Sequence, residues 1–196
     1  MNLSNDSSVR TQSRRKPRRP ARATVKSDAT EAAAGQLLEL FYPIHYKAGM
    51  ALDDAMRRGR LTRTQVAILW LIRSEGEAGT TMRRKEIERR IRLWFEITSS
   101  AITKALRAMA RAPLSLVSIV EDQQSAREKR VVLTATGKRF QSAMMAEGRS
   151  YLQGIITELS AADVAQGIRF LRQAIAALEV NDRLSPESPG RKPPAL

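Results

Sequence analysis

The sequence predicts a mainly α-helical protein with one small β-hairpin. Three observations support this prediction. Apolar residues recur in steps of three and four over most of residues 29–183. The segment VSIVEDQQSAREKRVVLTATG, residues 117–137, instead holds two β-favouring stretches separated by a charged loop. Residues 1–28 and 184–196 are rich in Pro, Ser and Arg without periodicity, so we expect two disordered tails around one domain.

Composition excludes several classes of function. The 196 residues include no Cys and one His, which excludes thiol nucleophiles and metal sites built from Cys or clustered His. The sequence has no Gly-rich phosphate loop and no nucleophile motif, so we predict neither an enzyme nor a bound cofactor. No apolar run approaches the roughly 18 residues of a membrane span. We therefore expect an intracellular protein with no membrane partner.

The formal net charge of +14 is spread along the chain. Residues 1–28 hold eight basic and two acidic residues, and residues 29–183 still hold 24 basic and 17 acidic ones. A basic folded domain favours a polyanionic partner, with nucleic acid first and an acidic membrane face second. A merely soluble basic surface fits the composition equally well. The basic N-terminal arm either follows phosphates or is a solvated tail.

An apolar stripe within residues 29–58 predicts the first helix. Pro43 lies inside this stripe, so we expect the helix to kink or break near Tyr42. The stripe consists of Leu37, Phe41, Ile44, Ala48, Ala51 and Ala55.

The next helix has a recognisable start. Thr62 and Gln65 have the spacing of a capping box, and Leu61 and Val66 have that of a hydrophobic staple. The following residues, VAILWLI, are apolar on every side, which predicts a buried central helix. We therefore expect Trp70 to be a core residue.

Two more helices precede the hairpin. MRRKEIERRI, residues 82–91, predicts a short basic helix, and LWFE predicts a connection to a helix from about Ser99 to Arg111, which Pro113 ends. On the second helix, hydroxyl and basic side chains share the face opposite the apolar one. Such a face fits the DNA major groove, although any solvated helix face is the alternative. The candidate base contacts are Ser99, Ser100, Thr103, Lys104 and Arg107.

Two helices follow the hairpin, whose strands are expected at about residues 116–120 and 130–133. Thr134 is the expected N-cap of the first helix and Ser160 that of the second. The last helix repeats apolar residues at steps of four and three, which requires another helix to cover them. That helix belongs either to the same chain or, as we favour, to a second subunit. The repeating residues are Val164, Ile168, Leu171, Ile175 and Leu178.

The order of the elements predicts a winged helix-turn-helix at about residues 61–134, flanked by dimerisation helices at about 29–58 and 135–180. The hairpin is the wing. We expect Arg127 at its tip to enter the minor groove, whose narrow form concentrates negative potential. A surface turn with arginines for solubility is the alternative. The expected contacts to the DNA backbone are Lys129 and Arg130 of the wing, together with Arg83 and Arg84.

Residues 31–180 resemble the MarR-type winged helix-turn-helix transcriptional regulators. The resemblance rests on LTRTQVAILWLI from Leu61, on VVLTATGKRF from Val131 with its Leu-Thr-x-x-Gly motif, and on LSAADVAQGIRFLRQAIAAL from Leu159. It implies a homodimer that places two recognition helices in successive major grooves of a pseudo-palindromic operator. It also implies a repressor that a small, often aromatic, ligand releases from DNA.

Three positions depart from the family pattern. Arg127 and Asp122 match the wing, but Ser125 replaces the Asp of the family's Asp-x-Arg element. The connection IRLWFEITSS is longer than usual, and Ser115 stands where Gly is expected. The sequence thus predicts a double-stranded DNA-binding transcriptional regulator, which we expect in the bacterial cytoplasm in association with the nucleoid. The alternative is a helical dimerisation or adaptor protein whose basic face binds an acidic protein partner.

Overall fold

The computed structural model describes residues 22–122 and 125–184, and the chain divides after Tyr46 into two units. The first unit contains α1 (Arg22–Pro43), so this helix begins before the predicted domain boundary at residue 29. No Pro or Gly interrupts residues 22–34, and Ala is frequent there, which favours a helix. The remaining parts of the two predicted tails lie outside the described residues.

The predicted break at Pro43 is confirmed, because the regular α-helix ends there. Pro43 has no backbone N–H to donate, and six residues of π-helix, η1 (Ile44–Gly49), follow it. α2 (Met50–Arg57) then continues the chain.

The capping box at the start of α3 (Arg63–Glu75) is confirmed. The Gln65 backbone N–H donates to Thr62 Oγ1 at 3.3 Å, and the Thr62 backbone N–H donates to Gln65 Oε1 at 2.9 Å. Leu61 and Val66 are buried, as a hydrophobic staple requires. The prediction for Trp70 was wrong, because 41% of its surface is exposed. One side of α3 borders a pocket instead of another helix, and Trp70 lies there.

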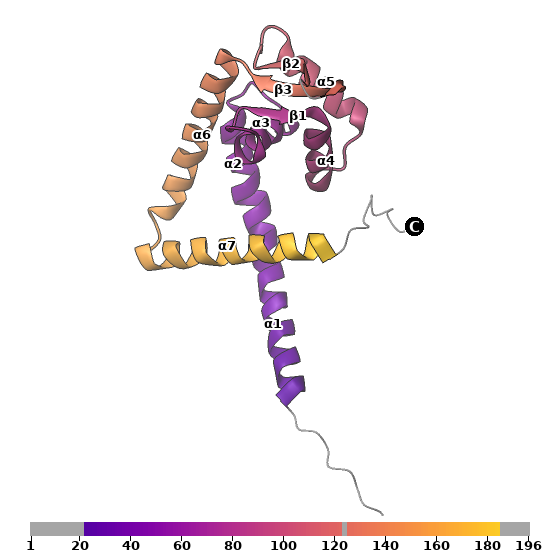
Figure 1. Ribbon diagram of the computed structural model, residues 1–196. Helices are drawn as coiled ribbons and strands as arrows, with labels where there is room; N and C mark the ends of the chain where they lie inside the picture. The colour runs from indigo at the N-terminus through magenta and orange to yellow at the C-terminus, as the bar shows by residue number, and fades with distance from the viewer. Residues whose placement is uncertain (1–21, 123–124, 185–196) are drawn as a thin grey trace, which may run out of the picture. The chain divides into compact units, whose positions relative to one another are not determined.

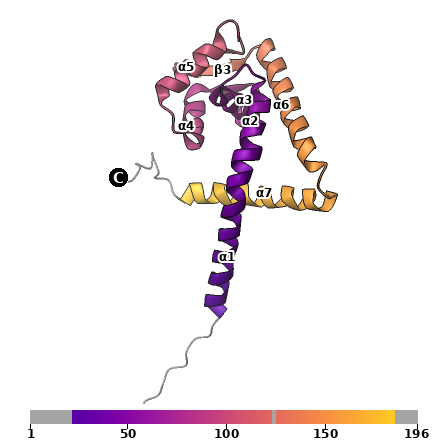
Figure 2. The same ribbon diagram turned by 180° about the vertical axis from the view of Figure 1, so that it is seen from behind.

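Three helices form the core of the second unit: α3, α4 (Arg84–Trp94) and α5 (Ser99–Ala110). They lie beside a small sheet and next to one another in both views (Figure 1 and Figure 2). Burial follows the predicted apolar faces. The core side chains of these helices, each at most 1% exposed, include Ile68, Leu69, Ile87, Ile91, Ile102, Leu106 and Met109.

The sheet has three antiparallel strands in the order β1-β3-β2. β2 (Val117–Asp122) and β3 (Ser125–Leu133) form the predicted hairpin, with Val117 opposite Leu133. β1 (Thr81–Arg83) was missed and was assigned to the following helix. Three residues are too few to show an alternating pattern, and β1 forms by pairing with a strand about 50 residues later. α4 therefore begins at Arg84, and it continues through Trp94 into the predicted connection.

The last two helices are α6 (Ala135–Ile156) and α7 (Ala161–Leu184). Both predicted caps are confirmed: Thr134 Oγ1 accepts from the Gly137 N–H at 2.9 Å, and Ser160 Oγ accepts from the Asp163 N–H at 3.1 Å. α6 packs on α2 at Gly148, where a Cβ would lie 3.2 Å from Met56 Cγ. Within the described ranges, no helix combines the length and apolar character that crossing a membrane requires.

Candidate nucleic-acid interface

α5 presents a hydroxyl and basic stripe on the side opposite its buried residues. Thr98 is its N-cap, accepting from the Ala101 N–H at 3.2 Å, so the helix begins at Ser99 as predicted. Ser100, Lys104 and Arg107 are exposed. Arg111, which directly follows the helix, continues the stripe at the same spacing and had not been included among the candidates. The residues that line one shallow hollow over this face are Ser100, Thr103, Lys104, Arg107, Ala108 and Arg111.

The other two candidate base contacts on α5 face α4. Arg84 Nη2 donates to Thr103 Oγ1 at 2.8 Å. Ser99 Oγ donates to Glu88 and accepts from Arg92. The structure therefore places Arg84, a predicted phosphate contact, against the candidate recognition helix.

The wing candidates differ in their surroundings. Lys129 is exposed, whereas only 18% of the Arg130 side chain is accessible. Arg127 belongs to β3, but its side chain lies outside the described residues, as do residues 123–124 at the hairpin turn.

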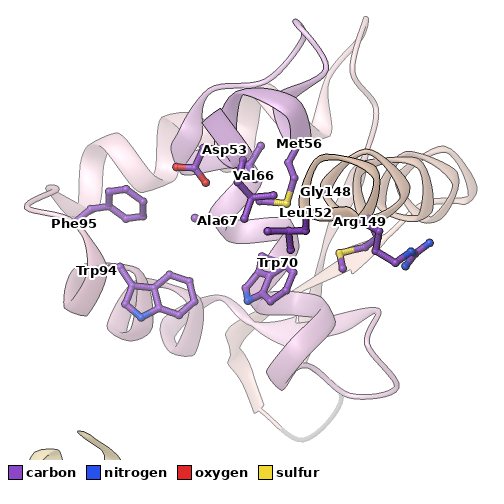
Figure 3. A pocket seen from close by; sticks show the side chains of 12 residues that line it. Asp53, Met56, Val66, Ala67, Trp70, Trp94, Phe95, Gly148, Arg149 and Leu152 are labelled. Atoms are coloured by element: carbon purple, nitrogen blue, oxygen red, sulfur yellow. The ribbon is translucent and has the colours of Figure 1, made fainter. Parts of the chain in front are cut away.

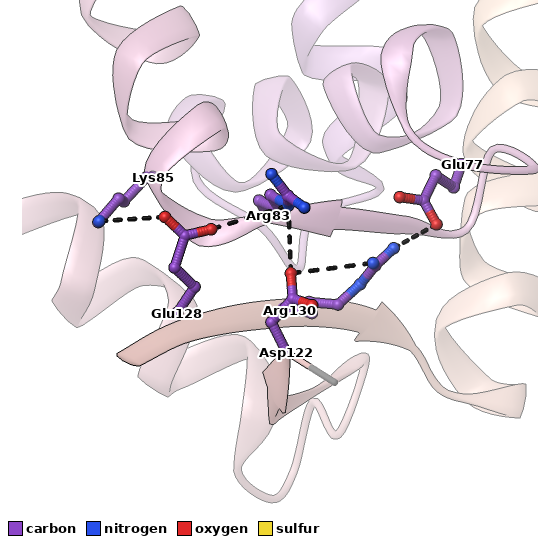
Figure 4. Close-up of polar contacts among 6 residues, drawn as sticks. All are labelled: Glu77, Arg83, Lys85, Asp122, Glu128 and Arg130. Atoms are coloured by element: carbon purple, nitrogen blue, oxygen red, sulfur yellow. Dashed lines mark hydrogen bonds and ion pairs between the residues drawn. The ribbon is translucent and has the colours of Figure 1, made fainter. Parts of the chain in front are cut away.

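A buried carboxylate joins the wing to β1 (Figure 4). The Asp122 side chain is only 1% exposed, and its Oδ2 lies 3.1 Å from Arg83 Nε and 3.9 Å from Arg130 Nη1. Arg130 also forms an ion pair with Glu77, which precedes β1. The predicted phosphate contacts Arg83 and Arg130 therefore both have carboxylate partners within the protein.

A second carboxylate extends this network to α4. Glu128 on β3 lies with Oε2 3.7 Å from Arg83 Nε and with Oε1 3.1 Å from Lys85 Nζ (Figure 4). The turn end of the hairpin is thus joined to β1 and to the first turn of α4. Sequence reasoning missed this network, although Asp122 had been matched to the family's wing, because its links from the hairpin to the β1 region and α4 join residues 39 to 53 positions apart.

A mainly apolar pocket of about 320 Å³ lies between α2, α3, α6 and the end of α4 (Figure 3). Both tryptophans of the chain, Trp70 and Trp94, line it, and Phe95 from the long connection adds a third aromatic ring. Asp53 at its edge lies 3.9 Å from Arg63 Nε. The remaining lining residues are Leu52, Met56, Val66, Ala67, Met145, Gly148, Arg149 and Leu152.

Comparisons with known proteins agree with this geometry. Residues 61–137 match the family model of a winged helix DNA-binding domain. A comparison with curated proteins gave no match. Among solved structures, a MarR family protein from Bacillus stearothermophilus has 18% identity and a TM-score of 0.64, covering 76% of this chain and 97% of its own.

Two further structures are similar over a comparable length. MepR, a transcription regulator of the Staphylococcus aureus multidrug efflux pump MepA, has 19% identity and a TM-score of 0.55, covering 71% of this chain and 96% of its own. A mutant MarR from E. coli, complexed with operator DNA, has 18% identity and a TM-score of 0.54, covering 71% and 93%.

Residues 61–137 have the winged helix fold. The chain has the fold of the MarR-type regulators, as the resemblance predicted.

Proposed function

We propose that the protein is a transcriptional regulator that binds double-stranded DNA in a sequence-specific manner as a cytoplasmic homodimer. The observation that carries this proposal is the exposed stripe of Ser100, Lys104, Arg107 and Arg111, opposite the buried face of α5 within a winged helix DNA-binding domain. Short hydroxyl and long cationic side chains on one helix face are able to contact base edges and phosphates together. The similarity to a MarR structure that holds operator DNA supports the same conclusion.

The proposal assigns different contacts to the two DNA-binding elements. The exposed α5 candidates Ser100, Lys104 and Arg107 meet the major groove, and Arg127 enters the minor groove. Ser99 and Thr103 lie on the flank of α5 that faces α4. Exposed Lys129 contacts phosphate directly. Arg83, Arg84 and Arg130 lie near the DNA backbone, and their contacts within the protein hold them there. These last three therefore contribute to DNA affinity through their position as well as through their charge.

A salt series tests the two kinds of contact. Lys129→Ala is expected to lower the slope of log Kd against log salt by about 1 without altering sequence preference. Arg107→Ala is expected to alter the preference. Arg127→Ala is expected to weaken operator binding at physiological salt, and unchanged binding would refute the role of the wing. If the wild-type protein shows no preference for duplex DNA over heparin competitor, the regulator proposal fails and an acidic protein partner is favoured.

The homodimer is supported by apolar side chains that the single chain leaves exposed. Ile168, Leu171 and Ile175 of α7 have exposed fractions of 48%, 56% and 57%, although they form the predicted repeating seam. A second copy that covers these residues would remove them from water, which stabilises an association. A two-fold dimer requires two half-sites about 34 to 36 Å apart on the operator. Selection of bound sequences from a random duplex pool measures this spacing.

The pocket supports the further proposal that a small-molecule effector binds the protein and releases it, as a repressor, from DNA. Aromatic and aliphatic walls favour a largely apolar ligand. Trp70 and Trp94 are the only two tryptophans of the chain, so intrinsic fluorescence reports on this pocket alone. A library of neutral and anionic aromatic compounds is titrated while fluorescence and operator binding are followed. A compound that changes both in the wild type and neither in Ala67→Trp, which fills the pocket, supports the effector proposal.

A further inference from the structure

One face of α4 contacts one flank of α5 through polar side chains. Arg84, Glu88 and Arg92 follow one another at intervals of four residues on α4, which places them along one face. Ser99 and Thr103 have the same interval on α5. Arg84 meets Thr103, and Glu88 and Arg92 meet Ser99. Two rows of side chains therefore join the two helices.

These contacts use the hydrogen-bonding capacity of both hydroxyls. Thr103 Oγ1 donates its proton to the Ser99 carbonyl at 2.8 Å and accepts from Arg84 Nη2 at 2.8 Å. Ser99 Oγ donates its proton to Glu88 and accepts from Arg92, which is itself 3.0 Å from Glu88. A hydroxyl has a single proton to donate. Neither hydroxyl therefore has a proton left for a base.

The stripe that faces away from α4 is arranged differently. Ser100 Oγ lies 3.0 Å from Thr98 Oγ1, a contact in which either hydroxyl can be the donor. Lys104, Arg107 and Arg111 are exposed and have long cationic side chains that bring several donors each. Potential donors to base edges therefore concentrate on this stripe.

We infer that Arg84, Glu88 and Arg92 are positioning residues, which act through Ser99 and Thr103 to fix the rotation of α5 about its axis. Sequence preference then comes from Ser100, Lys104, Arg107 and Arg111. This inference rests on the proposed DNA-binding function. Apolar contacts between α4 and α5 tolerate small rotations because they are not directional, whereas hydrogen bonds to Ser99 and Thr103 restrict the angle.

The experiment compares Thr103→Val with Thr103→Ser. Val has nearly the shape of Thr without the hydroxyl, and Ser keeps the hydroxyl. If Thr103 positions α5, Thr103→Val weakens binding to all selected duplexes by one common factor, about threefold to tenfold, the net worth of one lost hydrogen bond. Thr103→Ser restores wild-type affinity. Lys104→Ala, one residue further, instead changes the bases selected from a random duplex pool.

A double-mutant cycle tests the second contact. Ser99→Ala is expected to weaken binding less in a Glu88→Ala background than in the wild type, because the Glu88–Ser99 hydrogen bond is already lost there and only the Arg92 contact remains. Ser100→Ala is the matched control and is expected to add to Glu88→Ala independently. Thermal melts confirm that each variant is folded.

Two results have different meanings. If Ser99→Ala or Thr103→Val changes the preferred base at one operator position, as Lys104→Ala does, or if the Glu88 and Ser99 effects are additive, the positioning role is overturned while DNA binding stands. If the wild-type protein selects no sequence from the pool, the proposed function itself fails.

Discussion

Replacement of Gly137 by Ala tests how the hairpin is joined to α6. Gly137 lies in the first turn of α6, directly above the wing base. A Cβ at this position would be 1.9 Å from the Leu116 carbonyl oxygen and 2.9 Å from the carbonyl carbon. The same oxygen accepts from the Thr134 N–H at 3.0 Å. The glycine thus allows α6 to begin in contact with the backbone that leads into β2.

The expected cost follows from this contact. A carbon atom cannot approach a carbonyl oxygen to 1.9 Å, so α6 or the backbone at Leu116 has to move by about 1 Å or more. Overpacking of this kind costs about 1–3 kcal/mol, and loss of the Thr134 hydrogen bond costs about 1 kcal/mol more. The higher helix propensity of Ala returns about 1 kcal/mol. We therefore expect Gly137→Ala to lower the free energy of unfolding by about 2 kcal/mol.

The assay is thermal unfolding followed by circular dichroism. For a domain of this size, a loss of about 2 kcal/mol lowers Tm by roughly 4–8 °C. Gly154→Ala is the control, because Gly154 lies in the same helix with no atom within 4 Å of its added Cβ. This variant is expected to gain about 0.5–1 kcal/mol from helix propensity. If Gly137→Ala melts within 1 °C of the wild type, or both variants shift upward together, the steric argument is refuted.

Three further predictions concern the wing, a helix cap and the dimer. Asp122→Ala, which removes the 1% exposed carboxylate, is expected to cost about 1–3 kcal/mol in urea unfolding, whereas Glu121→Ala beside it costs under about 0.5 kcal/mol. Thr62→Ala is expected to lower stability by about 1 kcal/mol, and Thr62→Ser to preserve it. Ile175→Asp is expected to shift sedimentation at micromolar concentration towards the monomer, and Gln173→Asp, outside the seam, to leave it unchanged; equal effects would refute the seam.

Local interactions explain which elements were predicted correctly. The caps at Thr62, Thr134 and Ser160 depend on residues three positions away, so their spacing is visible in the sequence. The buried faces of α4 and α5 follow the helical period in the same way. The hairpin strands were predicted because β-favouring residues flank a short charged loop.

Features that depend on distant residues could not be predicted. β1 forms only because β3 pairs with it, and the Asp122 contacts require that sheet to exist first. Trp70 shows the same limit in another way. An apolar run predicts burial, but the pocket beside Trp70 depends on how α2, α6 and the end of α4 are placed around α3. Periodicity contains no information on that arrangement.

Three consecutive basic residues have different partners in the folded chain, although they look equivalent in the sequence. Arg83 pairs with Asp122, Arg84 bonds to Thr103, and Lys85 pairs with Glu128, so each one contacts a different element. In the sequence all three add equally to a basic surface. In the structure Arg83 uses part of its hydrogen-bonding capacity to contact the hairpin, and Arg84 uses part of its own to contact α5. Lys85, 77% exposed, forms a weak surface pair.

These pairings affect how strongly DNA binding depends on salt concentration. Counterions leave the DNA when a cation of the protein neutralises a phosphate. A cation that already pairs with a carboxylate releases fewer of them, because its field is partly compensated before binding. The count of 34 basic residues therefore overstates the number of phosphate contacts. We expect the salt dependence of DNA binding to depend mainly on exposed residues such as Lys104, Arg107 and Lys129. The paired arginines are expected to influence which geometry of DNA is bound.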